Sequence, residues 1–469
     1  MDRNMELINT VFKEKEDQII EICDKIWNYA EIAFQELKSS DIICQSLEKE
    51  GFRCEKEYLG LKTAFRAAYG HGRPHIGIIA DYDALPNMSQ KSGVCRQEKC
   101  GDNENGHGCG HCNIAGAAFG AAVALKKYLE INNKEGTVIV IGSPAEEAGS
   151  GKALLAENGA YRELDVAIYS HANMFNSVPS LPMVANVAME FTFKGVSAHA
   201  GASPHMGRNA LSAAELMGIG VNFMRENAIA DARIHYAYAD AGGEAANVIQ
   251  NYSKVKYLIR APKIEQVKEL AERIKKIARG AALMTETEME YVYTSGCSDY
   301  AQNKVLAQEI GKCYQEMGAP AWEAGDYSLA KEFYDSLSEE SKTQAAEKLR
   351  KYYDQIEDIL EKPLHSDVIL FDEKGKGYNF SSCDIGDVAH IVPTVYISFA
   401  SLAIGNMVHT WQCTALANTV LGHKAMLNAG KVIALFGTTL IETPEIMRRA
   451  REEHSKTYVH PYQCPLENR

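Results

Sequence analysis

The sequence predicts an α/β protein, in which a mixed, mostly parallel sheet forms the main domain and a smaller ferredoxin-like domain is inserted into it. Two observations support this fold class. Continuous apolar runs alternate with helical stretches, which is the pattern of parallel strands covered on both faces. In the middle of the 469-residue chain, the elements instead follow the order βαββαβ, which is typical of ferredoxin-like domains.

The predicted main domain starts with helices and continues with buried strands. Residues 5–50 have the apolar spacing of amphipathic helices and end at the turn "EGF". Apolar runs of strand length follow at 75–86, 137–147, 164–172 and 393–401. Because helical stretches at 113–130 and 150–160 separate the first three runs, parallel pairing of these strands is expected.

The inserted domain is predicted over residues 184–296, so that residues 1–183 and 297–469 form the main domain from two segments. Its first strand, at 187–195, alternates apolar and polar residues, as a half-exposed strand does. The remaining predicted elements are a helix at 207–225, strands at 232–238 and 252–260, a helix at 263–283 and a strand at 288–293. Farther on, residues 323–375 are rich in Glu and Lys, which predicts a polar helical insertion.

Composition limits the function classes that need to be considered. The formal net charge is −13, which argues against nucleic acid or an anionic membrane as a partner, because phosphate binding needs a basic surface. The first twenty residues carry charges throughout and lack the apolar region of a signal peptide. The twelve cysteines show no compact spacing framework, as expected of reduced, mostly buried thiols. We therefore expect a soluble cytoplasmic protein.

Chemically active side chains occur where the predicted strands end. In open α/β sheets, ligands bind beyond the carboxyl ends of the strands. Candidate side chains follow all four strands or lie in the loop "GCGHC", and they are Asp81, Asp83, Cys109, His111, Glu146, Glu147, His171 and His409. The sequence therefore predicts that groups from distant segments meet at one edge of the sheet.

This set of donors suits a pair of divalent ions, Zn²⁺, Mn²⁺ or Co²⁺. The thiolate of Cys109 could bridge two ions, and Asp83 could orient a ligand. Glu146 and Glu147 are adjacent at a strand end, so one of them can bind metal while the other remains free as a base. A bound metal lowers the pKa of water to about 7, which would make a hydroxide nucleophile available.

The same residues also allow other interpretations. The spacings of Cys95, Cys100, Cys109 and Cys112 fit a structural zinc knuckle. "GHGCG" differs from the dinucleotide motif G-x-G-x-x-G, and the glutamate pair alone could be a solvated helix start. Each Cys or His taken singly is more often an ordinary buried or polar residue. Only the metal centre accounts for all of the groups together.

Six motifs resemble one known family: "DYDALP", "NGHGCGH", "PAEEAGSGK", "GVSAHAGASP", "GGEAANVI" and "HTWQCTA". They resemble the aminoacylase/carboxypeptidase-type dinuclear metallopeptidases, in particular the amidohydrolase branch with p-aminobenzoyl-glutamate hydrolase and the indole-acetyl-amino-acid hydrolases. The resemblance implies that Cys109 is a bridging thiolate and that Glu146 is the general base. It further implies four more metal ligands, namely His111, Glu147, His171 and His409.

The resemblance also implies a homodimer joined through the inserted domain. In such a dimer, His199 would reach the active site of the partner and stabilise the oxyanion, and Asn247 and Arg260 would hold the substrate carboxylate. Asp83 matches the Asp of the superfamily's His-x-Asp motif, whereas Asp81 stands in place of its His. The branch commonly has Asn or Asp at Cys112 and a small or aromatic residue at His390, so these two positions depart from the pattern.

The expected function is therefore metal-dependent hydrolysis of the amide bond of an N-acyl or N-aroyl amino acid, similar to p-aminobenzoyl-glutamate. A dipeptidase acting on small dipeptides, such as β-alanyl ones, is an alternative from the same chemistry. A metal-binding homologue without activity is the alternative from another class, although Glu146 argues against it because only catalysis needs a free base. The expected ligand is a small molecule, with no nucleic-acid or membrane partner.

Overall fold

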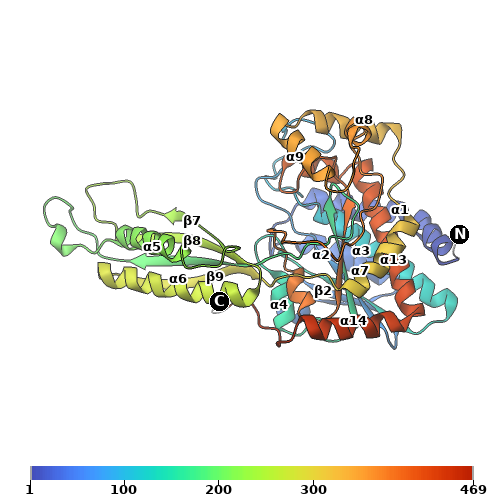
Figure 1. Ribbon diagram of the computed structural model, residues 1–469, viewed down its shortest axis with the longest axis horizontal. Helices are drawn as coiled ribbons and strands as arrows, with labels where there is room; N and C mark the ends of the chain where they lie inside the picture. The colour runs from blue at the N-terminus through green and yellow to red at the C-terminus, as the bar shows by residue number, and fades with distance from the viewer. Residues whose placement is uncertain (1–2, 467–469) are drawn as a thin grey trace.

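The structure is a computed structural model that describes residues 3–466, and it consists of a main body and a lateral arm (Figure 1). The main body contains a six-stranded sheet and most of the helices. The arm contains a four-stranded sheet with two helices and extends to the left in Figure 1. The predicted fold class, a mostly parallel sheet with an inserted ferredoxin-like domain, is confirmed.

The strands of the main sheet lie in the order β1-β2-β4-β3-β5-β10. Their bounds are β1 (Arg53–Lys56), β2 (Phe65–His71), β3 (His75–Ala80), β4 (Gly136–Gly142), β5 (Val166–Asn173) and β10 (Thr394–Ala400). The last four are the predicted strands, and they pair in parallel. The antiparallel strands β1 and β2 were not predicted, because the edge strand β1 is short and mostly exposed and β2 lacks a continuous apolar run.

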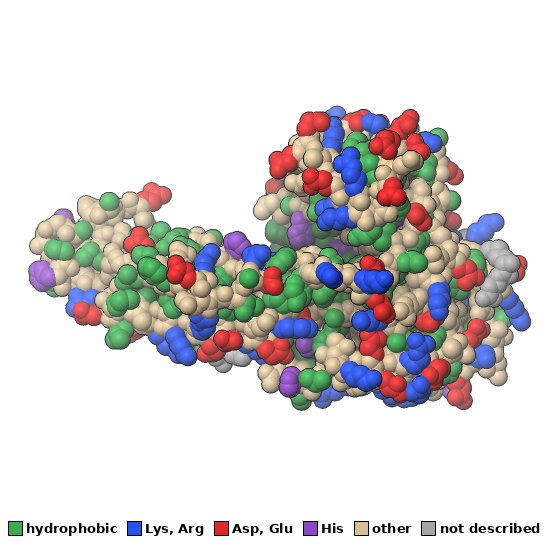
Figure 2. Space-filling view, in the orientation of Figure 1, with side chains coloured by type: hydrophobic (Ala, Val, Ile, Leu, Met, Phe, Trp, Pro, Cys, Tyr) green, Lys and Arg blue, Asp and Glu red, His purple; other side chains and the backbone are tan. Residues whose placement is uncertain are grey.

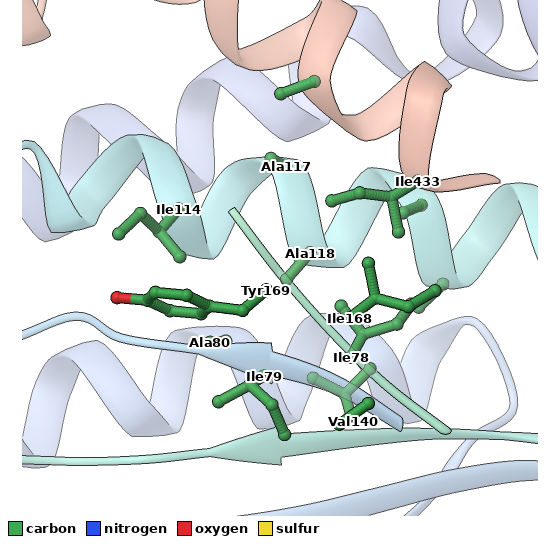
Figure 3. Packing of buried hydrophobic residues seen from close by; sticks show 14 of the residues in the cluster. Ile78, Ile79, Ala80, Ile114, Ala117, Ala118, Val140, Ile168, Tyr169 and Ile433 are labelled. Carbon is green, nitrogen blue, oxygen red and sulfur yellow. The ribbon is translucent and has the colours of Figure 1, made fainter. Parts of the chain in front are cut away.

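Helix α3 (His111–Asn132) packs directly on this sheet and is buried along most of its length. Figure 3 shows Ile114 and Ala118 of α3 on the side of the sheet with Ile78 of β3 and Ile168 of β5, whereas Ala117 lies on the opposite side of the helix. Small residues let neighbouring helices approach α3 closely: a Cβ atom added at Gly116 would lie 2.2 Å from Sδ of Met426. The alanine- and glycine-rich sequence of α3 thus fixes the helix that begins at the candidate ligand His111.

Two long helices pack against α3, namely α1 (Arg3–Tyr29) and α13 (Val420–Glu442). Among residues 3–466, α13 is the one helix long and apolar enough to cross a membrane. However, 78% of its most apolar window is buried inside the protein, so its composition is explained by packing in the core. The other helices of the main body are α2 (Leu37–Lys49), α4 (Gly151–Glu157), α7 (Lys304–Met317), α11 (Ile385–Ala389), α12 (Trp411–Ala417) and α14 (Pro444–Thr457), with a 3-10 turn η1 (Tyr58–Gly60).

The arm has the order β6-α5-β7-β8-α6-β9 along the chain and the strand order β7-β8-β6-β9 in its antiparallel sheet. The bounds are β6 (Ala185–Lys194), η2 (Pro204–Met206), α5 (Ala210–Arg225), β7 (Arg233–Asp240), β8 (Tyr252–Ala261), α6 (Ile264–Thr285) and β9 (Glu288–Cys297). Alternate residues of β6 are buried, as its sequence predicts. The division of the chain at residues 184 and 296 stays a prediction.

The polar insertion forms three helices, α8 (Ala324–Asp335), α9 (Glu339–Leu349) and α10 (Glu357–Glu361). Helices α8 and α9 lie at the top of Figure 1, and the insertion shares a small apolar core with the main body. Phe333 and Leu349 pack there with Leu402 and Ile404, which lie in the loop after β10. The insertion therefore supports the loop that carries His409.

Candidate metal centre

All five predicted metal ligands meet beyond the carboxyl ends of the parallel strands. The distance from Sγ of Cys109 to Nε2 of His171 is 3.4 Å, and that from Nε2 of His409 to Oε2 of Glu147 is 3.1 Å. Nε2 of His111 is 3.9 Å from a carboxylate oxygen of Glu147 and equally far from one of Glu146. Donor atoms of these residues form three overlapping groups, each within 4.8 Å.

Backbone geometry at the strand ends positions these side chains. His171 lies near the end of β5, whereas Glu146 and Glu147 follow β4 after Ala145, whose φ is 59°. His409 also has a left-handed backbone, with φ of 63°, and its N–H donates to the carbonyl of Gly108 over 2.6 Å. Non-glycine residues in this conformation are unfavourable and concentrate at functional sites. The loop after β10 is thereby attached to the loop that carries Cys109.

Asp83 forms hydrogen bonds with two of the candidate ligands. Its Oδ1 accepts from Nδ1 of His111 at 2.8 Å, and its Oδ2 accepts from the backbone N–H of Glu147 at 3.0 Å. The proton on Nδ1 leaves Nε2 of His111 available for a metal. Burial lowers the pKa of His111, but the charges of Asp83 and Glu147 outweigh this and raise it to about 10. The site thus carries surplus negative charge.

Two buried polar atoms at this site have no hydrogen-bond partner within the described chain, Nε2 of His111 and Oε1 of Glu147. An unsatisfied buried group costs about 1–3 kcal/mol, so a pair pointing at one place needs an explanation. A divalent cation would satisfy both atoms and neutralise the surplus charge. Thiolate, imidazole and carboxylate donors together fit Zn²⁺, Mn²⁺ or Co²⁺, so the residues present fit a metal centre.

The two adjacent glutamates have different environments. Burial raises the pKa of Glu146 well above its ordinary value, and the charges of Glu147 and Asp384 add to this effect. Burial acts in the same direction on Glu147, but the hydrogen bond from His409 and the charge of His111 lower its pKa overall. Pairs of carboxyl groups whose pKa values are pushed apart are typical of acid–base sites.

A buried ionic triad next to Glu146 was missed by the sequence analysis. Nζ of Lys152 lies 2.6 Å from Oδ1 of Asp81 and 2.7 Å from Oδ1 of Asp384, and all three side chains are almost completely buried. The hydroxyl of Tyr169 donates to the second oxygen of Asp81 at 2.6 Å. Asp81, which stands where the wider superfamily has a histidine ligand, thus pairs with a lysine. The available signal was a lysine inside the apolar segment "GKALLA".

Two predicted residues lie away from the centre within this chain. His199 is exposed on the arm, where its Nδ1 accepts from the N–H groups of Gly201 and Ala202. Asn247 is exposed on the same arm. Neither lines the cavity of about 300 Å³ at the centre. Arg260 does line it, and its Nη1 donates to Oγ of Ser382 at 2.7 Å.

The departures from the family pattern lie outside the centre. The Cys112 side chain faces Cys23 in the core, and Nε2 of His390 lies 3.1 Å from the carbonyl of Asp299. The zinc-knuckle interpretation is not supported, because the side chains of the four cysteines do not point to a common site. Sγ of Cys95 instead donates to the carbonyl of Glu332 at 3.2 Å.

Comparisons with known proteins agree with this geometry. Residues 77–405 match the family described as peptidase family M20/M25/M40. The chain is 34% identical over 465 residues to a p-aminobenzoyl-glutamate hydrolase subunit of Escherichia coli, covering 98% of this chain and 96% of that protein. It is 27% identical to mouse Xaa-Arg dipeptidase, covering 96% and 92% of the two chains.

Solved structures share the fold. A dinuclear metal-binding peptidase of the M20 family from Bacillus subtilis has a TM-score of 0.58 at 17% identity, covering 92% of this chain and 99% of that one. An aminobenzoyl-glutamate utilization protein from Klebsiella pneumoniae has a TM-score of 0.59 at 14% identity, covering 91% and 98%. The match extends over both the main body and the arm.

Proposed function

The chain belongs to peptidase family M20/M25/M40, and from this premise we propose that it is a metal-dependent amidohydrolase that cleaves N-aroyl amino acids such as p-aminobenzoyl-glutamate. One observation carries the proposal: five metal-ligating side chains converge on one point and leave a buried carboxyl group, Glu146, beside them. The end-to-end similarity to a subunit of p-aminobenzoyl-glutamate hydrolase supports the substrate class.

The metal ligands in this proposal are Cys109, His111, Glu147, His171 and His409. They would hold two divalent ions, manganese or zinc, with cobalt as a further candidate. When bound, such ions polarise a substrate carbonyl and make water a stronger acid. Asp83 keeps His111 in the tautomer that ligation needs.

Glu146 is the proposed general base. During hydrolysis, the oxygen of water joins the acyl carbon and the C–N bond breaks, so one proton must move from the water to the leaving nitrogen. Burial and the charges of Glu147 and Asp384 raise the pKa of Glu146, which makes this carboxylate a better proton acceptor. Its side chain is 10% exposed and lines the cavity, where a substrate would reach it.

Arg260 is the proposed binding group for the carboxylate of the amino acid. Among residues 3–466 it is the only Lys or Arg that lines the cavity of the metal centre. The hydroxyl of Ser382 accepts from its guanidinium and holds it in place. A guanidinium can bind a carboxylate through two parallel hydrogen bonds, which fixes the orientation of the substrate.

We further propose that the arm joins two copies of the chain. The edge strand β7 is exposed along almost its whole length, and Ile219, Phe223 and Leu283 are exposed on the arm helices. Exposed apolar patches of this kind mark interaction surfaces. The dimer would bring His199 of the partner subunit and Asn247 of the partner subunit to the metal centre, where a histidine can stabilise the oxyanion and an amide can bind the substrate.

The proposed location is the cytoplasm. All twelve cysteines are free, and Cys23 and Cys112 are buried against each other. Free thiols persist in a reducing compartment, as does a thiolate ligand such as Cys109.

A substrate panel tests the proposal. The protein is purified, loaded separately with Mn²⁺ and Zn²⁺, and offered p-aminobenzoyl-glutamate beside β-alanyl and Xaa-Arg dipeptides. Higher kcat/KM for p-aminobenzoyl-glutamate supports the amidohydrolase. Higher kcat/KM for the dipeptides would instead support the second candidate, a dipeptidase, which the similarity to Xaa-Arg dipeptidase favours. If the fully metal-loaded protein hydrolyses neither p-aminobenzoyl-glutamate nor the dipeptides, both candidate functions are overturned.

A further inference from the structure

A second cavity of about 480 Å³ opens directly beside the cavity of the metal centre. The two cavities share the walls formed by Asn173, Met183, Asn379, Tyr396 and Val408. Val408 precedes the candidate ligand His409 in the sequence. Figure 2 shows the hollow between the α8–α9 region and the arm, with histidine side chains in its depth. A substrate bound at the metal centre can therefore extend into the second cavity.

Asn406, in the wall of the second cavity, is a buried amide without a partner. The residue is only 1% exposed, and neither its Nδ2 nor its Oδ1 has a hydrogen-bond partner within the described chain. Buried amides are almost always satisfied, so an amide that lines a cavity and lacks both bonds indicates a ligand with polar groups.

Two lysines from the insertion, Lys348 near the end of α9 and Lys351 just after it, give the cavity a positive charge. Neither has a carboxylate partner within 4.0 Å among residues 3–466, although the protein as a whole is strongly acidic. Within the described part of the chain, no Asp or Glu lines the cavity. Burial and the nearby charge of Lys351 lower the pKa of Lys348. A bound anion would offset the repulsion between the two positive charges.

Aromatic side chains form the remaining walls. Phe175 and Tyr352 contact each other edge to face, with 6.0 Å between their ring centres. Tyr378 and Phe380 are each 37% exposed and face the same cavity. Exposed aromatic rings around a cavity are typical of sites that bind planar apolar groups.

We propose that the second cavity is the subsite for the acyl part of the substrate, and that among aroyl groups it prefers one that ends in a carboxylate over an uncharged one such as p-aminobenzoyl. This inference rests on the proposed amidohydrolase function. Arg260, the proposed group for the amino-acid carboxylate, lines the cavity of the metal centre but not the second cavity, so the second cavity is left for the acyl group, between the aromatic walls. Its terminal carboxylate accepts hydrogen bonds from Lys348, Lys351 and Nδ2 of Asn406.

Two substrates that differ in one group test this inference: N-benzoyl-glutamate and N-(p-carboxybenzoyl)-glutamate. We expect a kcat/KM about tenfold higher for the carboxylated substrate, mainly through a lower KM, as charge-assisted hydrogen bonds provide. In the double variant Lys348→Gln/Lys351→Gln, the ratio of the two kcat/KM values falls to about one. The matched control Lys342→Gln lies on the same helix, outside the cavity, and keeps the ratio of the unmodified protein.

Binding of terephthalate, measured by calorimetry on the metal-loaded protein, tests the subsite without catalysis. We expect binding that weakens about tenfold in the double lysine variant and in Asn406→Leu, but not in Lys342→Gln. Equal affinity in all variants, or equal kcat/KM for the two substrates, overturns the subsite. A protein that binds terephthalate through the two lysines yet hydrolyses no aroyl-glutamate retains the anion subsite and overturns the proposed amidohydrolase.

Discussion

Replacing Lys152 with methionine should destabilise the main body strongly at neutral pH. Lys152 is fully buried, and its Nζ neutralises two carboxylates, Asp81 and Asp384, at 2.6 and 2.7 Å. Removing one partner of a buried ion pair costs about 3–5 kcal/mol, because it leaves a buried charge without compensation. Partial protonation of Asp384, whose pKa burial has already raised to about 7, offsets some of this. We therefore expect a loss of about 3 kcal/mol at pH 7.

The sign of the pH dependence follows from Asp384. Its pKa in the folded protein is about 7, above its ordinary value of 3.8, because burial disfavours the charged form. Lys152 opposes this shift, so the variant should have a still higher pKa at Asp384. The folded variant then binds a proton that the unfolded chain does not, and its stability falls as the pH rises. The loss relative to the unmodified protein should be smaller at pH 5.5 than at pH 8.

Urea unfolding of the metal-free protein, followed by tryptophan fluorescence, measures this effect. The three tryptophans, Trp27, Trp322 and Trp411, all lie in the main body, so the signal reports on the part that contains the triad. Lys127→Met, at an exposed position of α3, is the matched control and should shift the midpoint little. A Lys152→Met midpoint equal to that of this control at both pH values would refute the reasoning.

Further predictions concern the metal centre. Glu146→Gln should retain metal, measured by elemental analysis, but lose at least about a hundredfold in kcat, the usual scale of general acid–base catalysis. Cys109→Ala should lose metal under the same analysis, and unchanged metal content would exclude a bridging thiolate. In the unmodified protein, bound metal should decrease as the pH falls from 7 to 5, because the ligands must be deprotonated to bind. The variants His199→Ala and Glu146→Gln should each be inactive alone. When the two are unfolded together and refolded as mixed dimers, activity should return, because one of the two sites then has both residues. If no activity returns, His199 is not donated across the dimer.

The sequence predicted the metal centre because its residues follow a local rule. A polar residue at the end of an apolar strand can be recognised within about ten residues, and parallel strands bring such ends to one edge. Asp83, Glu146 and His171 were all found in this way. The antiparallel strands β1 and β2 were missed because neither is an apolar run, and they become strands through pairing, β2 with β4 and β1 with β2.

Other features depend on pairings that no local pattern shows. Lys152 and Asp384 are 232 residues apart, and in the sequence each of them looks like an ordinary polar residue. The direction of Cys112 follows from helix geometry, since successive residues on a helix point about 100° apart. Because His111 faces the metal centre, Cys112 turns toward Cys23 in the core. The roles proposed for His199 and Asn247 would require a second copy of the chain.

The residues proposed for catalysis and those proposed to choose the substrate come from different parts of this chain. The groups proposed for bond cleavage come from short motifs, whereas the second cavity takes its walls mainly from four separate stretches, around residues 173–183, 348–352, 378–381 and 406–408. The second of these stretches belongs to the polar insertion. The helices of the insertion pack on the loop that carries His409 and bring Lys348 beside that cavity. A change in the insertion can therefore alter which acyl group is accepted while the ligands and Glu146 stay the same, which is why family membership indicates the reaction more directly than the substrate.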